Sequence, residues 1–143
     1  MNRGALNYDN YLDLKIRKNI IFPNLIYKNQ IQPSSIDLTL SSYCYEINSS
    51  FLSIKKKVKD KLLDYSKKKI DITNGFVIKK DKTYLIKINE KLNLPKNIFG
   101  KCNPKSSTGR LDIFCRTILN FSDEYEKIPF GYKGDVYLEV TSR

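Results

Sequence analysis

Short runs of alternating apolar and polar residues dominate this chain and restrict it to a fold built mainly of β-strands. The last run, residues 135–141, is the clearest, because alternate side chains of a strand point to opposite faces. Its two faces are Val136, Leu138 and Val140 on one side and Tyr137, Glu139 and Thr141 on the other. Many short strands separated by turn signals predict a β-sandwich or barrel. Hydrophobic residues make up 41% of the 143 positions, which is enough for the core of one domain.

The N-terminal part predicts one helix followed by extended chain. Apolar residues spaced four apart indicate a helix over residues 8–18. Residues 20–26 are apolar but interrupted by a proline, so they favour a strand edge or an extended segment. After a second proline, alternation over residues 36–40 predicts a strand. A further alternating run, 43–47, continues that strand across a bulge at residues 41–42.

A lysine-rich stretch interrupts the β pattern at residues 54–69, where apolar residues with helical spacing predict a short, exposed amphipathic helix. Strands resume after it: the pair 74–75 is an Asn-Gly turn signal, 76–78 predicts a short strand and 84–88 a further one. The chain stops directly after a strand, and a compact barrel needs more strand than this. We therefore expect a single domain over residues 1–143 with part of its C-terminus missing.

The formal net charge is +11, and residues 55–69 carry more than half of the excess, with eight lysines against two aspartates giving +6. We interpret this stretch as a solvated face and do not expect nucleic acid as a partner. No apolar run of about 18 residues exists, so no membrane-spanning segment is expected. The three cysteines are widely spaced and odd in number, which favours a reduced, cytoplasmic setting over a disulfide framework.

Histidine is absent from the whole chain. This excludes a Ser-His-Asp triad, a Cys-His dyad and any metal site that depends on imidazole ligands. Catalysis, if the chain is an enzyme, must use carboxylates, hydroxyls, lysine, arginine or backbone groups.

Three segments carry side chains suited to chemistry. Residues 31–40 hold Asp37 in an apolar setting where a carboxylate needs partners; a purely structural carboxylate is the alternative. Residues 103–110 combine three hydroxyls, a glycine and two cations, the groups that bind phosphate; an ordinary turn with a helix N-cap has the same composition. Residues 131–140 place Glu139 on a strand, where it is a general acid or base if buried and an ordinary surface residue if not.

In this order, the three segments resemble dCTP deaminases of the dUTPase-like superfamily. Residues 33–40 resemble that family's Pro-x-Ser-x-Asp-Leu-x-Leu strand. Residues 105–110 are similar to its Arg-Ser-Ser-x-x-Arg phosphate motif, and residues 134–139 to its Gly-x-x-x-Leu-Glu strand with the catalytic glutamate. The resemblance covers residues 31–143. The amino-acid sequence of residues 103–112 is most similar to that of the longer deaminases of alphaproteobacteria.

The resemblance implies a distorted, dUTPase-like β-barrel with short helices that assembles as a homotrimer with active sites between subunits. It assigns catalysis to Glu139, Ser106 and Arg110, with Glu139 moving protons and the other two near the reacting water. The residues it implies for binding dCTP are Lys105, Ser106, Ser107, Arg110, Thr117 and Lys127. Asp37 would be structural, and Mg²⁺ would bind through the substrate triphosphate. One departure is Lys105, which replaces an arginine and loses its bidentate geometry.

The implied reaction is the zinc-independent hydrolysis of dCTP to dUTP and ammonia, in pyrimidine deoxynucleotide biosynthesis. Zinc deaminases hold their metal with histidine and cysteine, and this chain has neither histidine nor a Pro-Cys-x-x-Cys sequence. One alternative is a dUTPase, or a bifunctional enzyme that also cleaves dUTP to dUMP. The other is a non-catalytic, nucleotide-binding β-domain.

Overall fold

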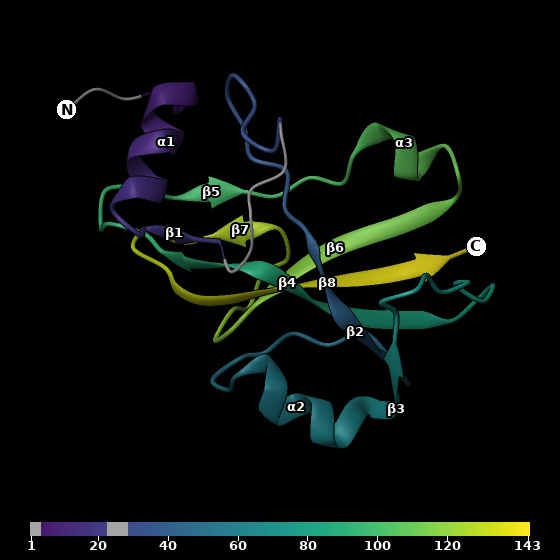
Figure 1. Cartoon of the computed structure of the whole chain (residues 1–143). Coiled ribbons are helices and arrows are strands. Elements are labelled where there is room, and N and C mark those ends of the chain that lie inside the picture. Colours follow the sequence, from purple (N-terminus) through teal and green to yellow (C-terminus); the bar gives the residue numbers. More distant parts are fainter. Residues whose placement is uncertain (1–3, 23–28) are drawn as a thin grey trace.

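An antiparallel sheet in the order β3-β2-β4-β8-β6 forms the centre of the computed structural model, which describes residues 4–22 and 29–143 (Figure 1). Its strands are β2 (Leu40–Ile47), β3 (Ser66–Asp71), β4 (Thr83–Asn93), β6 (Ile113–Leu119) and β8 (Lys133–Ser142). The short β1 (Ile20–Ile21) pairs with β4, and β5 (Gly100–Lys101) pairs separately with β7 (Lys127–Ile128). The helices are α1 (Tyr8–Ile16), α2 (Val58–Tyr65) and α3 (Ser106–Gly109). The prediction of a mainly β fold with short helices is confirmed.

Strand β8 lies between β4 and β6, and its side chains divide between two cores as its alternating sequence predicts. On one face, Val140 packs with the buried Tyr84 and neighbouring apolar residues. On the opposite face, Tyr137 joins a second core cluster. The register places Glu139, on the Tyr137 face, directly opposite Arg116 of β6.

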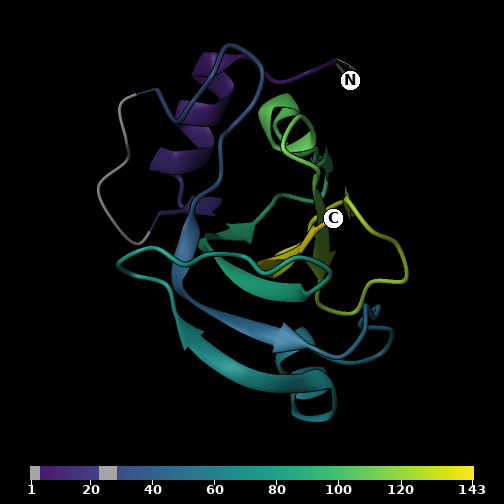
Figure 2. The same cartoon turned by 90° about the vertical axis from the view of Figure 1, so that its right-hand side faces the viewer.

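Helices α1 and α2 cover opposite sides of the sheet, as the two perpendicular views show (Figures 1 and 2). Leu14 of α1 is buried in a core with apolar residues of β4, β6 and β8. Val58 and Leu62 of α2, with Phe51 from the loop before it, are buried on the face that carries Tyr137. The β2–β3 connection therefore covers most of this second face, and Tyr125 from the loop between β6 and β7 packs against the same cluster.

The N-terminal helix was predicted over residues 8–18 and is observed over 8–16. It begins after Asn7, whose side chain accepts from the backbone N–H of Asn10 while the side chain of Asn10 accepts in return from that of Asn7. It ends two residues earlier than predicted because Lys18 has a positive φ of 56°, which a right-handed helix cannot contain.

The lysine-rich stretch is helical over a shorter range than the predicted 54–69. Helix α2 spans Val58–Tyr65, and from Ser66 the chain is already the strand β3. Pairing of β3 with β2, which joins Ser66 to Ile47, supplies backbone hydrogen bonds that a longer exposed helix would not gain. The helix is also half-buried rather than exposed, because Val58 and Leu62 face the core while its lysines face solvent.

Two predicted strands are absent from the described residues. Within the 36–40 run, Ile36 makes only an isolated antiparallel bridge to Ile31, and the chain joins the sheet at Leu40. The backbone N–H and hydroxyl of Thr39 donate to the carboxylate of Glu90 on β4 instead, at 2.9 and 2.8 Å. Residues 76–78 follow the turn at 73–74 without joining a ladder. The bulge predicted near 41–42 is confirmed by a register shift between Leu40 and Cys44.

The remaining predictions for the chain have mixed outcomes. The predicted strand at 84–88 is confirmed as part of the longer β4. Within the predicted extended segment 20–26, residues 20–21 form β1, and residues 23–26 lie outside the described residues.

Candidate functional site

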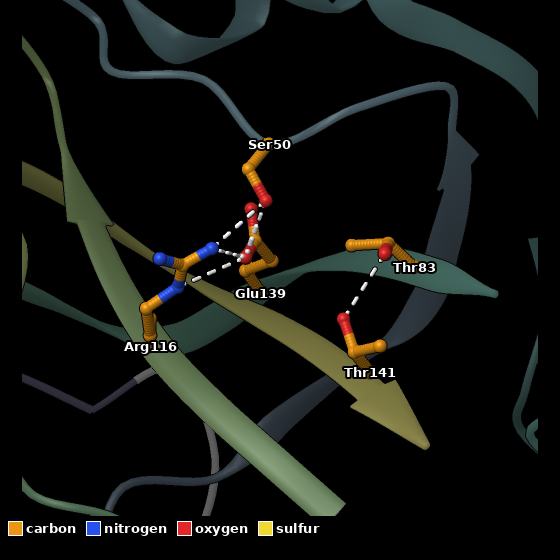
Figure 3. Close-up of polar contacts among 5 residues, drawn as sticks. All are labelled: Ser50, Thr83, Arg116, Glu139 and Thr141. Carbon is orange, nitrogen blue, oxygen red and sulfur yellow. Dashed lines mark hydrogen bonds and ion pairs between the residues drawn. The ribbon is translucent and has the colours of Figure 1, made fainter. Parts of the chain in front are cut away.

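Glu139 is one of two buried carboxylates on the central sheet: it is 3% exposed on β8, and Glu90, 2% exposed on β4, accepts hydrogen bonds on both of its oxygens. The Oε1 atom of Glu139 accepts three hydrogen bonds: from Nε and Nη2 of Arg116 at 3.1 and 2.6 Å, and from the hydroxyl of Ser50 at 2.9 Å (Figure 3). Its Oε2 atom is buried and has no hydrogen-bond partner among the described residues. One oxygen is thus fully occupied, and the other keeps its capacity to bind a donor.

Arg116 reaches Glu139 from the neighbouring strand β6, where it is the directly paired residue. The hydrogen bonds from Arg116 to Glu139, more than the charge attraction, raise the pKa of the guanidinium above its usual value. The guanidinium also lies 4.3 Å from the centre of the Tyr125 ring, a cation–π arrangement. Burial is the main cause of the raised pKa of the Tyr125 hydroxyl. Arg116 is therefore held between a carboxylate and an aromatic face.

Ser50 completes this cluster from the loop between β2 and α2. Its hydroxyl donates to Glu139 and accepts from Nη2 of Arg116 at 2.8 Å, so it bridges both partners. Two residues further along β8, the hydroxyls of Thr141 and Thr83 lie 3.0 Å apart and extend the polar strip on this face (Figure 3). We call Glu139, Arg116 and Ser50 the carboxylate cluster.

Sequence reasoning identified Glu139 but missed Ser50 and the pairing of Arg116. Ser50 lies 89 residues from Glu139 in the chain, and no local pattern reports such a contact. Arg116 faces Glu139 in the register of β6 on β8, where a cation opposite a carboxylate forms a cross-strand pair, and no sequence pattern gives that register.

The predicted phosphate segment, residues 105–110, lies apart from the carboxylate cluster within one chain. Ser106 begins the single turn of α3, and Ser106, Ser107 and Arg110 are exposed. Helix α3 precedes Ile113, the first residue of β6. Three strand residues at about 3.3 Å each put Arg116 about 10 Å beyond that point. The single chain therefore does not bring Ser106 or Arg110 into contact with Glu139.

Lys105 and Asp37 are joined by an ion pair of 2.7 Å between Nζ and Oδ2. Asp37 is only partly buried, so its partner is a surface cation rather than the backbone amides of a core strand. This contact connects the first and second of the three segments singled out in the sequence. The structural role predicted for Asp37 stays a prediction.

Thr117 and Lys127 occupy different surroundings. The Thr117 hydroxyl is buried and has no partner among the described residues, while its carbonyl accepts from the backbone N–H of Glu126 at 3.1 Å. Lys127 is exposed on β7 and pairs with Glu124 at 2.7 Å. Neither contact tests a substrate-binding role, and both roles stay predictions.

The described part of the chain contains neither a cluster of potential metal ligands nor a helix suited to a membrane. Within residues 4–22 and 29–143, no group of three or more acidic, cysteine or histidine side chains is arranged to hold a metal ion. No helix within those same ranges has the length and apolar character needed to cross a membrane.

Comparison with known proteins gives one consistent family. The family profile described as the 2'-deoxycytidine 5'-triphosphate deaminase N-terminal domain matches residues 2–143. A "dCTP deaminase, dUMP-forming" of Corynebacterium glutamicum is 30% identical over 113 residues, covering 78% of this chain and 56% of the relative. A protein of the same name from Coprothermobacter proteolyticus is 29% identical over 118 residues, covering 80% of this chain and 59% of the relative.

A solved structure shows the same similarity in three dimensions. The crystal structure of 2'-deoxycytidine 5'-triphosphate deaminase from Agrobacterium tumefaciens superposes with a TM-score of 0.94 at 35% identity. The match covers 98% of this chain and 42% of that one. The chain thus spans about half the length of the relatives it matches.

Proposed function

Because the chain belongs to the dCTP deaminase family of the dUTPase-like superfamily, we propose that it takes part in the hydrolytic deamination of dCTP. The observation that supports this best is the state of Glu139. Its Oε1 is held by Arg116 and Ser50, while its buried Oε2 has no partner within the described residues. A carboxylate held in this way is oriented to exchange protons with a bound ligand.

The reaction replaces the C4 amino group of cytosine by oxygen. Water attacks C4, a proton reaches N3, and the C4–N bond breaks to release ammonia, so dCTP and water give dUTP and ammonia. In our proposal, the Oε2 atom of Glu139 accepts the two protons of the attacking water in turn, and it delivers one to N3 and the other to the leaving amine. Arg116 and Ser50 are positioning residues that fix the carboxylate plane, and no zinc is required.

The triphosphate would be bound by Lys105, Ser106, Ser107 and Arg110. These groups suit phosphate because hydroxyls donate to its oxygens and the two cations neutralise its charge, and Mg²⁺ would bind through the phosphates. Since Ser106 and Arg110 do not contact Glu139 in one chain, we propose that a neighbouring subunit of a homotrimer supplies them. In this arrangement Ser106 and Arg110 also hold the attacking water, and Lys127 and the backbone around Thr117 lie near the pyrimidine.

A second candidate, a bifunctional reaction, follows from the names of the relatives. Those from Corynebacterium glutamicum and Coprothermobacter proteolyticus are both described as dUMP-forming. A dUMP-forming enzyme also hydrolyses the bond between the α- and β-phosphates, which releases pyrophosphate. The two candidates predict different nucleotide products from the same substrate.

Chromatographic separation of the products formed from dCTP and Mg²⁺ tests both candidates. Appearance of dUTP supports deamination alone, and appearance of dUMP supports the bifunctional reaction. If the chain converts neither dCTP nor added dUTP, the proposal is wrong. Activity that persists after treatment with a zinc chelator supports the zinc-independent route, and loss of activity contradicts it.

The variant Glu139→Gln tests the assigned residue, because it keeps the shape of the side chain and removes its proton-accepting capacity. We expect turnover to fall by at least about 100-fold, as is usual for a lost general acid–base group. Glu46→Gln is the matched control, since Glu46 on β2 lies outside the carboxylate cluster and pairs with Lys82 at 3.7 Å, away from every residue assigned to the substrate. Wild-type turnover in Glu139→Gln would show that another group moves the protons.

A further inference from the structure

A cavity of about 570 Å³ opens beside the carboxylate cluster, between the N-terminal end of α2 and strands β4 and β8. Four lysines line it: Lys57 and Lys59 from α2 and the residue before it, Lys91 from β4 and Lys133 from β8. We call this the lysine cavity. Neither Glu139 nor any residue of the segment 105–110 lines it, so it is distinct from both parts of the proposed active site.

The charge of the lysine cavity is strongly positive. The only carboxylate in its lining is Asp135, and Lys87 already pairs with that group at 3.2 Å. Asp60 of α2 also raises the pKa of the Tyr137 hydroxyl, as the smallest of its causes. Four lysines line one hollow, so their positive charges repel each other, and an anion bound there would reduce that repulsion.

Tyr137 adds a phenol to the lining of the cavity. Its side chain is only 5% exposed and reaches the cavity from β8. Burial, and to a smaller extent Asp135, raises the pKa of this hydroxyl to about 12. The phenol therefore stays protonated near neutral pH and can donate a hydrogen bond into the cavity.

The N-terminal end of α2 adds a third feature on the same side. Its N-cap, Lys57, provides no side-chain acceptor, and the N–H of Val58 is satisfied by the side chain of Asn120. Asp60 lies in the first turn of α2, while Lys57 at the N-cap and Lys59 line the cavity. The lysines of the lining favour a negatively charged, oxygen-rich ligand.

We propose that the lysine cavity binds a ligand with two or more linked phosphate groups, either a nucleoside polyphosphate or an inorganic polyphosphate. A single phosphate carries at most about two negative charges, which is fewer than the four lysines of the lining. The volume lies within the usual range for small-molecule sites, about 300–1,000 Å³. Tyr137 donates to a phosphate oxygen, and the lysines neutralise the chain of phosphates.

Titration of the isotopically labelled full chain with tripolyphosphate, followed by TROSY NMR, locates the site. We expect the largest chemical-shift changes at residues 57–59, 91–93 and 133–137. Shift changes confined to 105–110, or spread evenly over all lysine-rich surfaces, would overturn the proposal. Parallel titrations with dCTP and ATP distinguish a nucleoside polyphosphate from an inorganic polyphosphate as the ligand. If the nucleotides bind at the same residues more tightly than tripolyphosphate, the cavity is a nucleotide site. If the affinities are equal, it is a polyphosphate site.

Calorimetry on variants separates specific binding from general attraction to a basic protein. Lys91→Ala combined with Lys133→Ala is expected to weaken tripolyphosphate binding at least about tenfold, since each lost contact is a charge-assisted hydrogen bond. Tyr137→Phe removes one donor, and we expect a several-fold loss from it. The matched control, Lys67→Ala with Lys68→Ala, removes the same charge from exposed positions on β3, and we expect it to bind like the wild type.

Equal losses in the cavity variant and the control would show that the surface attracts anions without a site. Arg110→Ala should leave the chemical-shift changes at residues 57–59, 91–93 and 133–137 unchanged, and their loss in this variant would assign the polyphosphate to the segment 105–110 instead. A single-stranded oligonucleotide that shifts the same residues while tripolyphosphate does not would also overturn the proposal. Circular dichroism shows whether each variant is folded. If the double variant Lys91→Ala, Lys133→Ala does not fold, the loss of tripolyphosphate affinity in Tyr137→Phe tests the proposal in its place.

Discussion

Replacing Arg116 by alanine is expected to destabilise the fold, because it leaves a buried carboxylate without its counter-ion. The substitution removes two N–H donors to Oε1 of Glu139, at 2.6 and 3.1 Å, and the guanidinium that lies on the ring of Tyr125. Ser50 remains as the only donor to a side chain that is 3% exposed. One hydroxyl does not replace a positive charge.

The magnitude follows from the different exposure of the two partners. Breaking a fully buried ion pair by removing one member costs about 3–5 kcal/mol, because the other charge stays desolvated. The side chain of Arg116 is 44% exposed, so water can enter where the guanidinium was and solvate Glu139 in part. We therefore expect a loss of about 2–3 kcal/mol in the free energy of unfolding, between the values for buried and surface pairs.

Urea unfolding followed by circular dichroism at neutral pH and fixed protein concentration measures this loss. In the background of Glu139→Gln, where the charge is already absent, Arg116→Ala should cost only about 1 kcal/mol, which leaves a coupling energy of about 1–2 kcal/mol. Arg116→Met keeps apolar packing on Tyr125 and serves as the control for that contact. A change below about 0.5 kcal/mol in Arg116→Ala would refute the reasoning, since the pair would then contribute like an exposed one.

Three further outcomes are expected. The pKa of Tyr137 is raised to about 12 from an ordinary value near 10, so its contribution to stability is complete below about pH 10 and is lost as the pH rises through 12. Unfolding measured against pH should show that Tyr137→Phe reduces this alkaline loss of stability by about 1–2 kcal/mol. The control Tyr8→Phe should leave the alkaline loss unchanged. Gly134→Ala should cost about 2–4 kcal/mol in thermal unfolding, because φ is +157° and the new Cβ would lie 2.8 Å from a tyrosine oxygen, whereas Gly109→Ala, with open space around it, should change stability by less than about 0.5 kcal/mol. Glu90→Leu should cost about 2–4 kcal/mol in urea unfolding, because three donors lose their buried acceptor; a neutral result would show that these donors find water.

The strands that were predicted correctly are those whose order is determined locally. Residues 135–141 alternate without interruption, and both cores on the two sides of β8 use that alternation. The bulge near 41–42 was also predictable, because the alternating pattern shifts phase there. In each case the information lies within about ten neighbouring residues.

The predictions that failed depend on distant partners. Residues 36–40 alternate like a strand, but the carboxylate of Glu90 takes the hydrogen bonds of Thr39 that a neighbouring strand would have used. The lysine-rich helix stops at Tyr65 because β2 offers Ser66 a pairing partner. Neither competitor is visible in the sequence next to the segment it alters.

The candidate site shows the same division. Glu139 was identifiable from its motif, although a lone strand glutamate is more often exposed than buried. Its two partners were not, since Arg116 reads as one of many cations and Ser50 as part of a polar loop. Their contacts span 23 and 89 residues of chain, and only the folded sheet brings them together.

The connection between β2 and β3, residues 48–65, which contains the helix α2, has a consequence for protein engineering. To a designer wishing to lower the charge or shorten the domain, it resembles a dispensable surface insertion. Yet the same stretch supplies Phe51, Val58 and Leu62 to the core and Ser50 to the buried carboxylate. Excision would expose an apolar face and open the surroundings of Glu139 to solvent. Neutralising single lysines on the outer side of α2 is the change that reduces charge and leaves the interior closed.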